Sequence, residues 1–193
     1  TSPVFNPATG EQSGVVALAN ASEVQEAVDA ARNAQADWAN TAIIRRARTM
    51  FKLKELIEAH MDEIAATVTA EHGKTFDDAK GSVTRGLEVV EFACGIPQLL
   101  KGEFNHNVGT SVDLLSVRHP IGVTAGITPF NFPVMVPLWM APLAIACGNA
   151  FILKPSEKDP SSSMMLAELA LEAGIPAGIF QVVNGGKDAV NAI

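Results

Sequence analysis

The sequence predicts an α/β fold, in which a helical N-terminal segment is followed by an incomplete parallel sheet. Apolar residues recur with helical spacing through most of residues 1–104. From Pro120 onward, short apolar strands alternate with helical segments. With 193 residues and 48% hydrophobic content, the chain is long enough to bury a sizeable core.

The first helix is predicted to begin near Ser22. Ser22 and Gln25 have the spacing of a capping box, in which two side chains bind backbone amides at the start of a helix. Val24, Val28 and Ala31 follow at helical spacing. One face of this helix is therefore expected to be buried.

Two further helices are predicted before residue 104. The apolar face of the first runs from Ala47 to Val68. Gly73 is expected to end that helix, and the next is predicted from Phe76 to Leu99. The charged residues of the longer helix are expected on its other faces: Arg45, Arg46, Lys52, Lys54, Glu55 and Glu58.

The spacing of apolar residues changes between residues 105 and 118. Residues 109–118 alternate roughly as a strand does and include few helix formers. This strand-rich segment is expected to extend away from the main core, where an exposed edge would pair with a neighbouring molecule.

Residues 119–193 are predicted to form the first part of a Rossmann-like fold. The expected strands cover residues 121–127, 150–153 and 179–183, and the expected helices cover residues 134–146, 162–173 and a segment from Lys187. Short connections between them imply a parallel sheet covered on both faces. Ligands of such sheets bind beyond the carboxyl ends of the strands.

Composition argues against several classes of partner. The 14 basic and 21 acidic residues include no basic stripe, so no nucleic acid is expected. The most apolar stretch, Val134 to Leu153, is interrupted by Pro137 and Pro142, which suits a buried helix and strand better than a membrane span. The four histidines have no metal-ligand spacing, so no metal site is expected.

The two cysteines, Cys94 and Cys147, form neither a CxxC motif nor a disulfide framework. Their apolar neighbours favour core packing over a nucleophilic role. The first residues show no secretory signal. We therefore predict a reducing compartment, the cytoplasm or, in a eukaryote, the mitochondrial matrix.

Two short motifs follow the first two predicted strands of residues 119–193. Thr128-Pro129-Phe130-Asn131-Phe132-Pro133 places an uncharged amide donor between two prolines, where an oxyanion donor could sit. Lys154-Pro155-Ser156-Glu157 ends the next strand. Each motif also has an ordinary interpretation, because Asn is common in turns and an exposed Lys–Glu pair contributes little stability.

Together the two motifs resemble the signatures of the aldehyde dehydrogenase superfamily, although Phe130 stands where many relatives have Trp. The resemblance implies that Asn131 is the oxyanion donor. It also implies that Thr128 and Phe130 line the nicotinamide ribose of NAD and that Lys158 lies at the edge of this cofactor.

The second motif is expected to bind the adenosine ribose. The Lys154 ammonium can donate to the ribose hydroxyls and the Glu157 carboxylate can accept from them. The carboxylate would also repel a 2′-phosphate, so NAD is predicted in preference to NADP.

Residues 81–95 and 134–140 are similar to the methylmalonate-semialdehyde dehydrogenase branch, which acylates coenzyme A. This resemblance implies NAD-dependent oxidation of methylmalonate or malonate semialdehyde, with decarboxylation and acyl transfer to give propionyl-CoA or acetyl-CoA. Arg85 is predicted to bind the substrate carboxylate bidentately. The alternative is a helix-surface ion pair with Glu88 or Glu91.

In relatives of this kind the nucleophilic cysteine belongs to a later catalytic domain, expected outside this chain. Residues 1–104 and 119–193 would then be two parts of one NAD-binding domain, and residues 105–118 would bridge subunits of a homodimer or homotetramer. The chain stops within a predicted helix, so we expect a truncated and inactive piece. Two alternatives stay open: a hydrolytic semialdehyde dehydrogenase, or a non-catalytic fragment that binds nucleotide or supports oligomerisation.

Overall fold

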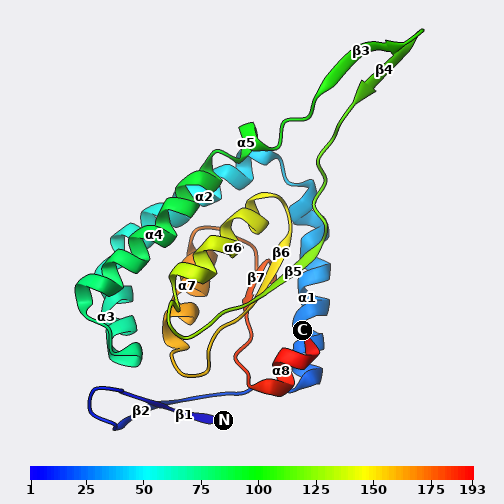
Figure 1. Ribbon diagram of the computed structural model, residues 1–193. Coiled ribbons are helices and arrows are strands. Elements are labelled where there is room, and N and C mark those ends of the chain that lie inside the picture. The colour runs from blue at the N-terminus through cyan, green and yellow to red at the C-terminus, as the bar shows by residue number, and fades with distance from the viewer.

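A three-stranded parallel sheet forms the centre of the computed structural model, which describes all residues 1–193 (Figure 1). Its strands are β5 (Val123–Ile127), β6 (Ala150–Lys154) and β7 (Phe180–Val182), in the order β5-β6-β7. The central strand β6 is buried along its whole length. The predicted α/β fold and its parallel sheet are confirmed.

Helices cover both faces of this sheet. The crossover helices α6 (Met135–Ala146) and α7 (Ser161–Glu172) lie on one face, as right-handed crossovers in this strand order require. Helix α1 (Ala21–Asn40) packs against all three strands on the opposite face, beside α8 (Lys187–Ala192) (Figure 1).

Three more helices form an outer layer over α6 and α7. They are α2 (Ile43–Ala59), α3 (Met61–His72) and α4 (Phe76–Cys94), followed by the short α5 (Ile96–Leu99). Helix α4 crosses α6 so closely that a Cβ added at Gly86 would lie 2.7 Å from Leu138 Cδ1. A side chain at residue 86 would therefore force Leu138 to move.

Both long helices predicted in this layer are interrupted. The first breaks at His60, whose ψ of 13° departs from helical geometry, and α3 then turns to pack against α7 as well as α4. The second breaks at Gly95, because Pro97 lies in the first turn of α5 and has no amide for a continuous helix. Gly73 ends α3 with a φ of 84°, as predicted.

The start of α1 also differs from the prediction. Asn20 Oδ1 accepts hydrogen bonds from the amides of Ser22 and Glu23, at 2.9 and 3.1 Å. Glu23 Oε2 in turn accepts from the Asn20 amide at 2.8 Å. The capping box is therefore formed by Asn20 and Glu23, and Ser22 belongs to the first turn.

Arg46 does not lie on an exposed face, contrary to the prediction. Its side chain is buried, because the end of α6 and the α1–α2 turn supply carbonyl acceptors for the guanidinium. Nε donates to the carbonyl of Ala146 at 3.0 Å, and Nη1 donates to those of Ala39 and Thr41. Trp38 Nε1 donates to the carbonyl of Ile145 at 2.8 Å, so two side chains join α1, α2 and α6.

The segment from residue 104 to 115 forms an antiparallel hairpin that extends away from the body (Figure 1). Its strands are β3 (Phe104–Gly109) and β4 (Val112–Leu115), and every residue in them is exposed. The segment expected to be strand-rich over residues 105–118 is this hairpin, and the strand-like pattern at residues 109–118 is divided by a turn at Ser111, with φ of 60°. A second hairpin, β1 (Ser2–Phe5) and β2 (Gln12–Val16), was not predicted.

No helix in the structure combines the length and the apolar character that crossing a bilayer requires.

Candidate functional site

The loops that leave β5 and β6 lie side by side at the carboxyl edge of the sheet. Ile127 pairs with Lys154 in the register of the two strands, and the Thr128 amide continues the ladder by donating to the carbonyl of Lys154 at 3.0 Å. The two motifs are therefore brought together, at the edge where parallel sheets bind their ligands.

Thr128 is buried where β5 ends, with 4% of its surface exposed. Its hydroxyl has no hydrogen-bond partner within the chain. Buried hydroxyls usually have a hydrogen-bond partner, so the Thr128 hydroxyl at the end of this strand is an exception.

Lys154 and Glu157 form an ion pair of 3.1 Å between Nζ and Oε2. The Lys154 side chain is only 6% exposed, so the interpretation as an exposed surface pair is wrong for this lysine. Backbone hydrogen bonding at Glu157, followed by the Lys154 ammonium, lowers the pKa of the Glu157 carboxyl despite its partial burial. Near neutral pH this edge therefore presents an ammonium next to a carboxylate.

Phe130 lies between the end of α3 and the loop after β6. The His72 ring stacks against it with 6.1 Å between centroids, and Lys158 Nζ lies 4.7 Å from the Phe130 centroid. Burial, followed by the nearby charge of Lys74, lowers the pKa of His72. Phe130 thus joins the first motif to Lys158 while remaining half-exposed.

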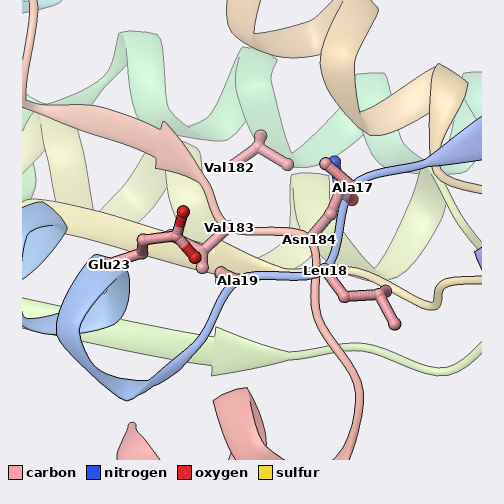
Figure 2. Close-up of a pocket in the computed structure, with 7 residues that line it drawn as sticks. All are labelled: Ala17, Leu18, Ala19, Glu23, Val182, Val183 and Asn184. Atoms are coloured by element: carbon pink, nitrogen blue, oxygen red, sulfur yellow. The ribbon is translucent and has the colours of Figure 1, made fainter. Parts of the chain in front are cut away.

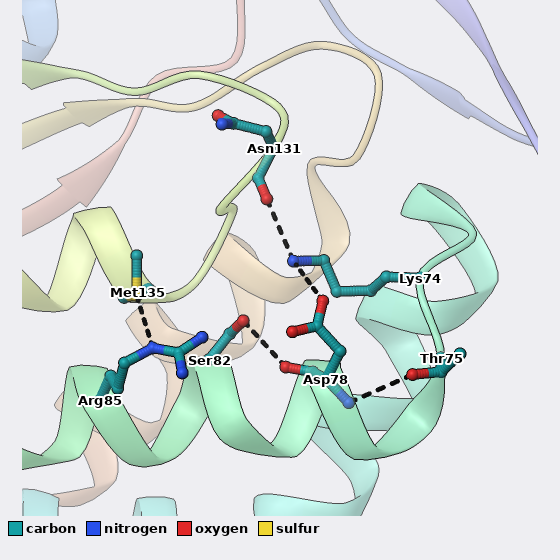
Figure 3. Close-up of polar contacts among 7 residues, drawn as sticks. All are labelled: Lys74, Thr75, Asp78, Ser82, Arg85, Asn131 and Met135. Atoms are coloured by element: carbon teal, nitrogen blue, oxygen red, sulfur yellow. Dashed lines mark hydrogen bonds and ion pairs between the residues drawn. The ribbon is translucent and has the colours of Figure 1, made fainter.

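The side-chain amide of Asn131 is exposed and has no hydrogen-bond partner within the chain. Its backbone carbonyl accepts from Lys74 Nζ at 3.1 Å. Figure 3 shows the amide pointing to the opposite side from Lys74. The side chain is therefore free to donate to a molecule bound outside the loop.

Arg85 lies on the exposed side of α4 near the start of α6 (Figure 3). Nε contacts Met135 Sδ at 3.4 Å, and Trp139 Nε1 donates to the Arg85 carbonyl at 3.3 Å. Its guanidinium forms no ion pair with Glu88 or Glu91, because neither carboxylate comes within salt-bridge distance. The helix-surface pair, which was the alternative to substrate binding, is absent from the structure.

A hollow lies away from these residues, beyond the carboxyl end of β7 (Figure 2). It has a volume of about 300 Å³, and its walls come from the segment before α1 and from the end of β7. A hydrogen bond of 2.8 Å from the Ala19 amide to the Asn184 carbonyl joins these two segments. None of the predicted site residues lines it; its lining is Ala17, Leu18, Ala19, Glu23, Val182, Val183 and Asn184.

Three polar residues near the motifs were missed in the sequence: Lys74, Glu71 and Asp159. Glu71, at the end of α3, accepts from the amide and hydroxyl of Ser161 at the start of α7. Burial, followed by repulsion from Glu71, raises the pKa of the Asp159 carboxyl to about 7. For Lys74 the sequence offers one signal of a fixed position. It directly follows Gly73, which ends α3, and therefore lies in a turn.

Both cysteines pack with the hydrophobic core, as predicted. Cys94 is buried in α4, and the half-buried Cys147 follows α6. Burial raises the pKa of both thiols, so they remain protonated near neutral pH. Neither is an activated nucleophile.

The whole chain, residues 1–193, matches the aldehyde dehydrogenase family. It is 54% identical over 190 residues to malonate-semialdehyde dehydrogenase of Pseudomonas aeruginosa, covering 98% of this chain and 38% of that protein. It is also 54% identical to the mitochondrial acylating methylmalonate-semialdehyde dehydrogenase of Arabidopsis thaliana, covering 98% of this chain and 31% of that protein.

Solved structures agree. A methylmalonate-semialdehyde dehydrogenase of Oceanimonas doudoroffii superposes with a TM-score of 0.97 at 56% identity, over 99% of this chain and 39% of that one. A Sinorhizobium meliloti protein assigned to the same enzyme class and solved with NAD superposes with a TM-score of 0.98 at 57% identity, over 100% of this chain and 39% of that one. The chain thus spans less than two fifths of the length of these relatives, and it belongs to the aldehyde dehydrogenase family.

Proposed function

We propose that the protein carrying this chain is an NAD-dependent semialdehyde dehydrogenase that acylates coenzyme A. Its substrates are methylmalonate and malonate semialdehyde, which lose CO₂ and give propionyl-CoA or acetyl-CoA. The observation that carries this proposal is that the loop with Asn131 and the Lys154–Glu157 ion pair follow neighbouring strands at the same edge of the sheet. The names of the relatives at 54% identity support the class of substrate.

The residues at this edge fit NAD. Lys154 would donate to hydroxyls of the adenosine ribose, and Glu157 would accept from them while repelling a 2′-phosphate. Thr128, with its unpartnered buried hydroxyl, and Phe130 would line the nicotinamide ribose, and Lys158 would border the cofactor. When bound, NAD supplies the hydride acceptor.

Asn131 would stabilise the reaction by donating from its free amide to the aldehyde oxygen as negative charge develops there. Removing one such donor typically raises the barrier by about 2.7–4 kcal/mol. The nucleophilic thiol would come from outside residues 1–193, because Cys94 and Cys147 are protonated and packed in the core.

Arg85 would bind the carboxylate that distinguishes a semialdehyde from a simple aldehyde. Its guanidinium has no acidic partner in the chain, and its contact with Met135 orients it near the segment that carries Asn131. A planar guanidinium can bind such a carboxylate through two parallel hydrogen bonds.

The active protein would be a homo-oligomer, a dimer or tetramer, in which the β3–β4 hairpin contacts a second subunit. This hairpin is exposed throughout and carries apolar side chains that a partner would cover: Phe104, Val108, Val112, Leu114 and Leu115. Two free cysteines suit a reducing compartment, the cytoplasm or, in a eukaryote, the mitochondrial matrix; the name of the Arabidopsis relative includes the word mitochondrial.

Turnover by the full-length protein tests the proposal. NADH formation from malonate and methylmalonate semialdehyde should require coenzyme A, and mass spectrometry should detect acetyl-CoA and propionyl-CoA. Equal rates without coenzyme A, with release of a free acid, would instead support a hydrolytic semialdehyde dehydrogenase. Binding of NAD without any aldehyde oxidation would support a non-catalytic nucleotide-binding protein.

Substitution of Arg85 tests the class of substrate. Arg85→Ala should raise KM for semialdehydes roughly 10- to 100-fold, since a charge-assisted bidentate pair is lost. It should change KM for propionaldehyde, which has no carboxylate, by much less. Arg48→Ala, at an exposed arginine of α2, is the matched control and should change neither value.

A further inference from the structure

We propose that Lys74 is a positioning residue, which holds the backbone of Asn131 so that the Asn131 amide meets the developing oxyanion. This inference rests on the proposed function, in which Asn131 is the oxyanion donor. Lys74 itself touches neither substrate nor cofactor in this role, because it binds the loop from the side opposite the Asn131 amide (Figure 3).

The Lys74 ammonium has three partners. It donates to the Asn131 carbonyl at 3.1 Å, pairs with Asp78 Oδ2 at 3.4 Å and lies 4.5 Å from the centroid of the Phe132 ring. The Lys74 side chain is only 8% exposed, so these contacts replace most of its water. An ammonium held among a carbonyl, a carboxylate and an aromatic face has little freedom to move.

The chain around Lys74 fixes where this ammonium lies. Gly73 ends α3 in the left-handed conformation, and a Cβ there would lie 2.8 Å from Pro7 Cγ. Thr75 caps α4 by accepting from the Asp78 amide at 3.3 Å. Lys74 is thus confined between a helix end and a helix start, beneath the loop that carries Asn131.

The Asn131 amide depends on such support because its own side chain has no hydrogen bond in the chain and is exposed. Oxyanion donors act by being oriented before the reaction, and misplacement by about 1 Å can cost about 100-fold in rate. Lys74 provides the only side-chain hydrogen bond to the backbone of Asn131 itself. Loss of this bond should therefore reduce turnover through Asn131.

A double-mutant cycle in the full-length protein tests this inference. Asn131→Ala should lower kcat about 100- to 1,000-fold, and Lys74→Met about 10- to 100-fold. The double variant should be no slower than Asn131→Ala alone, because Lys74 then has no donor left to position. The Kd for NAD, measured by fluorescence titration, should change less than about threefold in both single variants.

Two further variants keep the test decisive. Lys80→Met is the matched control, since Lys80 also pairs with an aspartate and lies over a phenylalanine on α4 but does not reach the loop; it should leave kcat unchanged. Lys74→Arg keeps the charge beside Asp78 with a displaced donor, so it should fold normally and lower kcat several-fold. It also replaces Lys74→Met in the cycle if that variant does not fold.

The outcomes separate the two proposals. Two results would overturn the positioning role and leave the proposed function standing. One is an unchanged kcat in Lys74→Met; the other is that Lys74→Met lowers kcat by the same factor in the wild-type and in the Asn131→Ala background. Unchanged kcat in Asn131→Ala would overturn the oxyanion role of Asn131, and the role of Lys74 with it.

Discussion

The Asp159 carboxyl is buried. Its two neighbours in the chain differ in exposure, because Lys158 is exposed and Pro160 is buried. Its pKa is raised from 3.8 to about 7, first because burial disfavours the charged form and then because Glu71 repels it. The folded protein therefore retains a proton that the unfolded chain releases at lower pH. This proton couples folding stability to pH.

Replacing Asp159 should reveal that coupling. The retained proton contributes its full stability at pH values below the pKa of Asp159 in the unfolded chain. This contribution is lost as the pH rises through about 7, the pKa of Asp159 in the folded protein. As the pH rises from 4 to 8, the free energy of unfolding of Asp159→Asn should therefore increase by about 2–4 kcal/mol relative to that of wild type. Urea denaturation of the full-length protein across this range measures the difference. The exposed Asp37→Asn is the control, and parallel curves for wild type and Asp159→Asn would contradict the prediction.

Buried side-chain hydrogen bonds join the carboxyl end of helix α1 to α2 and α6. Arg46 on α2 donates to carbonyls at the end of α6 and in the α1–α2 turn, and Trp38 donates to the carbonyl of Ile145. These carbonyls would otherwise be helix-end acceptors without partners in a buried place. The sheet is thus clamped between α1 and α6 by side chains at one end.

Arg46→Leu should destabilise this junction. It leaves several buried carbonyls without a donor, so the free energy of unfolding should fall by about 2–4 kcal/mol. Arg45→Leu, at the adjacent exposed arginine, should change it by less than about 0.5 kcal/mol. Denaturation midpoints of the two full-length variants give the comparison. Equal midpoints would show that the buried guanidinium is dispensable.

Sequence patterns predicted elements better than they predicted their junctions. The strands and helices after Pro120 follow from apolar runs and helical spacing, which depend on neighbouring residues. The break at His60 and the buried place of Arg46 depend on packing between distant segments, which spacing within one helix does not reveal. The site divides in the same way: its motifs are local, whereas Lys74 reaches Asn131 only because α3 and α4 meet beneath the loop.

The whole molecule consists of a layered body and one projecting hairpin (Figure 1). The body buries its apolar side chains in one core cluster, whereas the hairpin leaves its own exposed. A two-stranded hairpin is at most marginally stable alone, so the long β3–β4 ribbon is expected to gain its stability from another molecule.

Charges on this ribbon should weaken the oligomer. Val112→Asp combined with Leu114→Asp places two carboxylates on the surface proposed to contact a second subunit. Light scattering with size-exclusion chromatography of the full-length protein should then show a lower mass than wild type. Thr110→Asp, in the turn at the hairpin tip, is the control. An unchanged mass in the double variant would exclude the ribbon from the interface.

The contact between Glu71 and Ser161 has a consequence for how this chain could be recombined. A carboxylate from α3 binds the first amide of α7, a helix ninety residues further along the chain. A chimaera that takes residues 1–104 from one relative and the remainder from another would keep this bond if the first parent supplies Glu71 and the second has any residue except proline at position 161. At this contact, exchange of the two segments between relatives is therefore expected to be tolerated wherever residue 71 remains acidic.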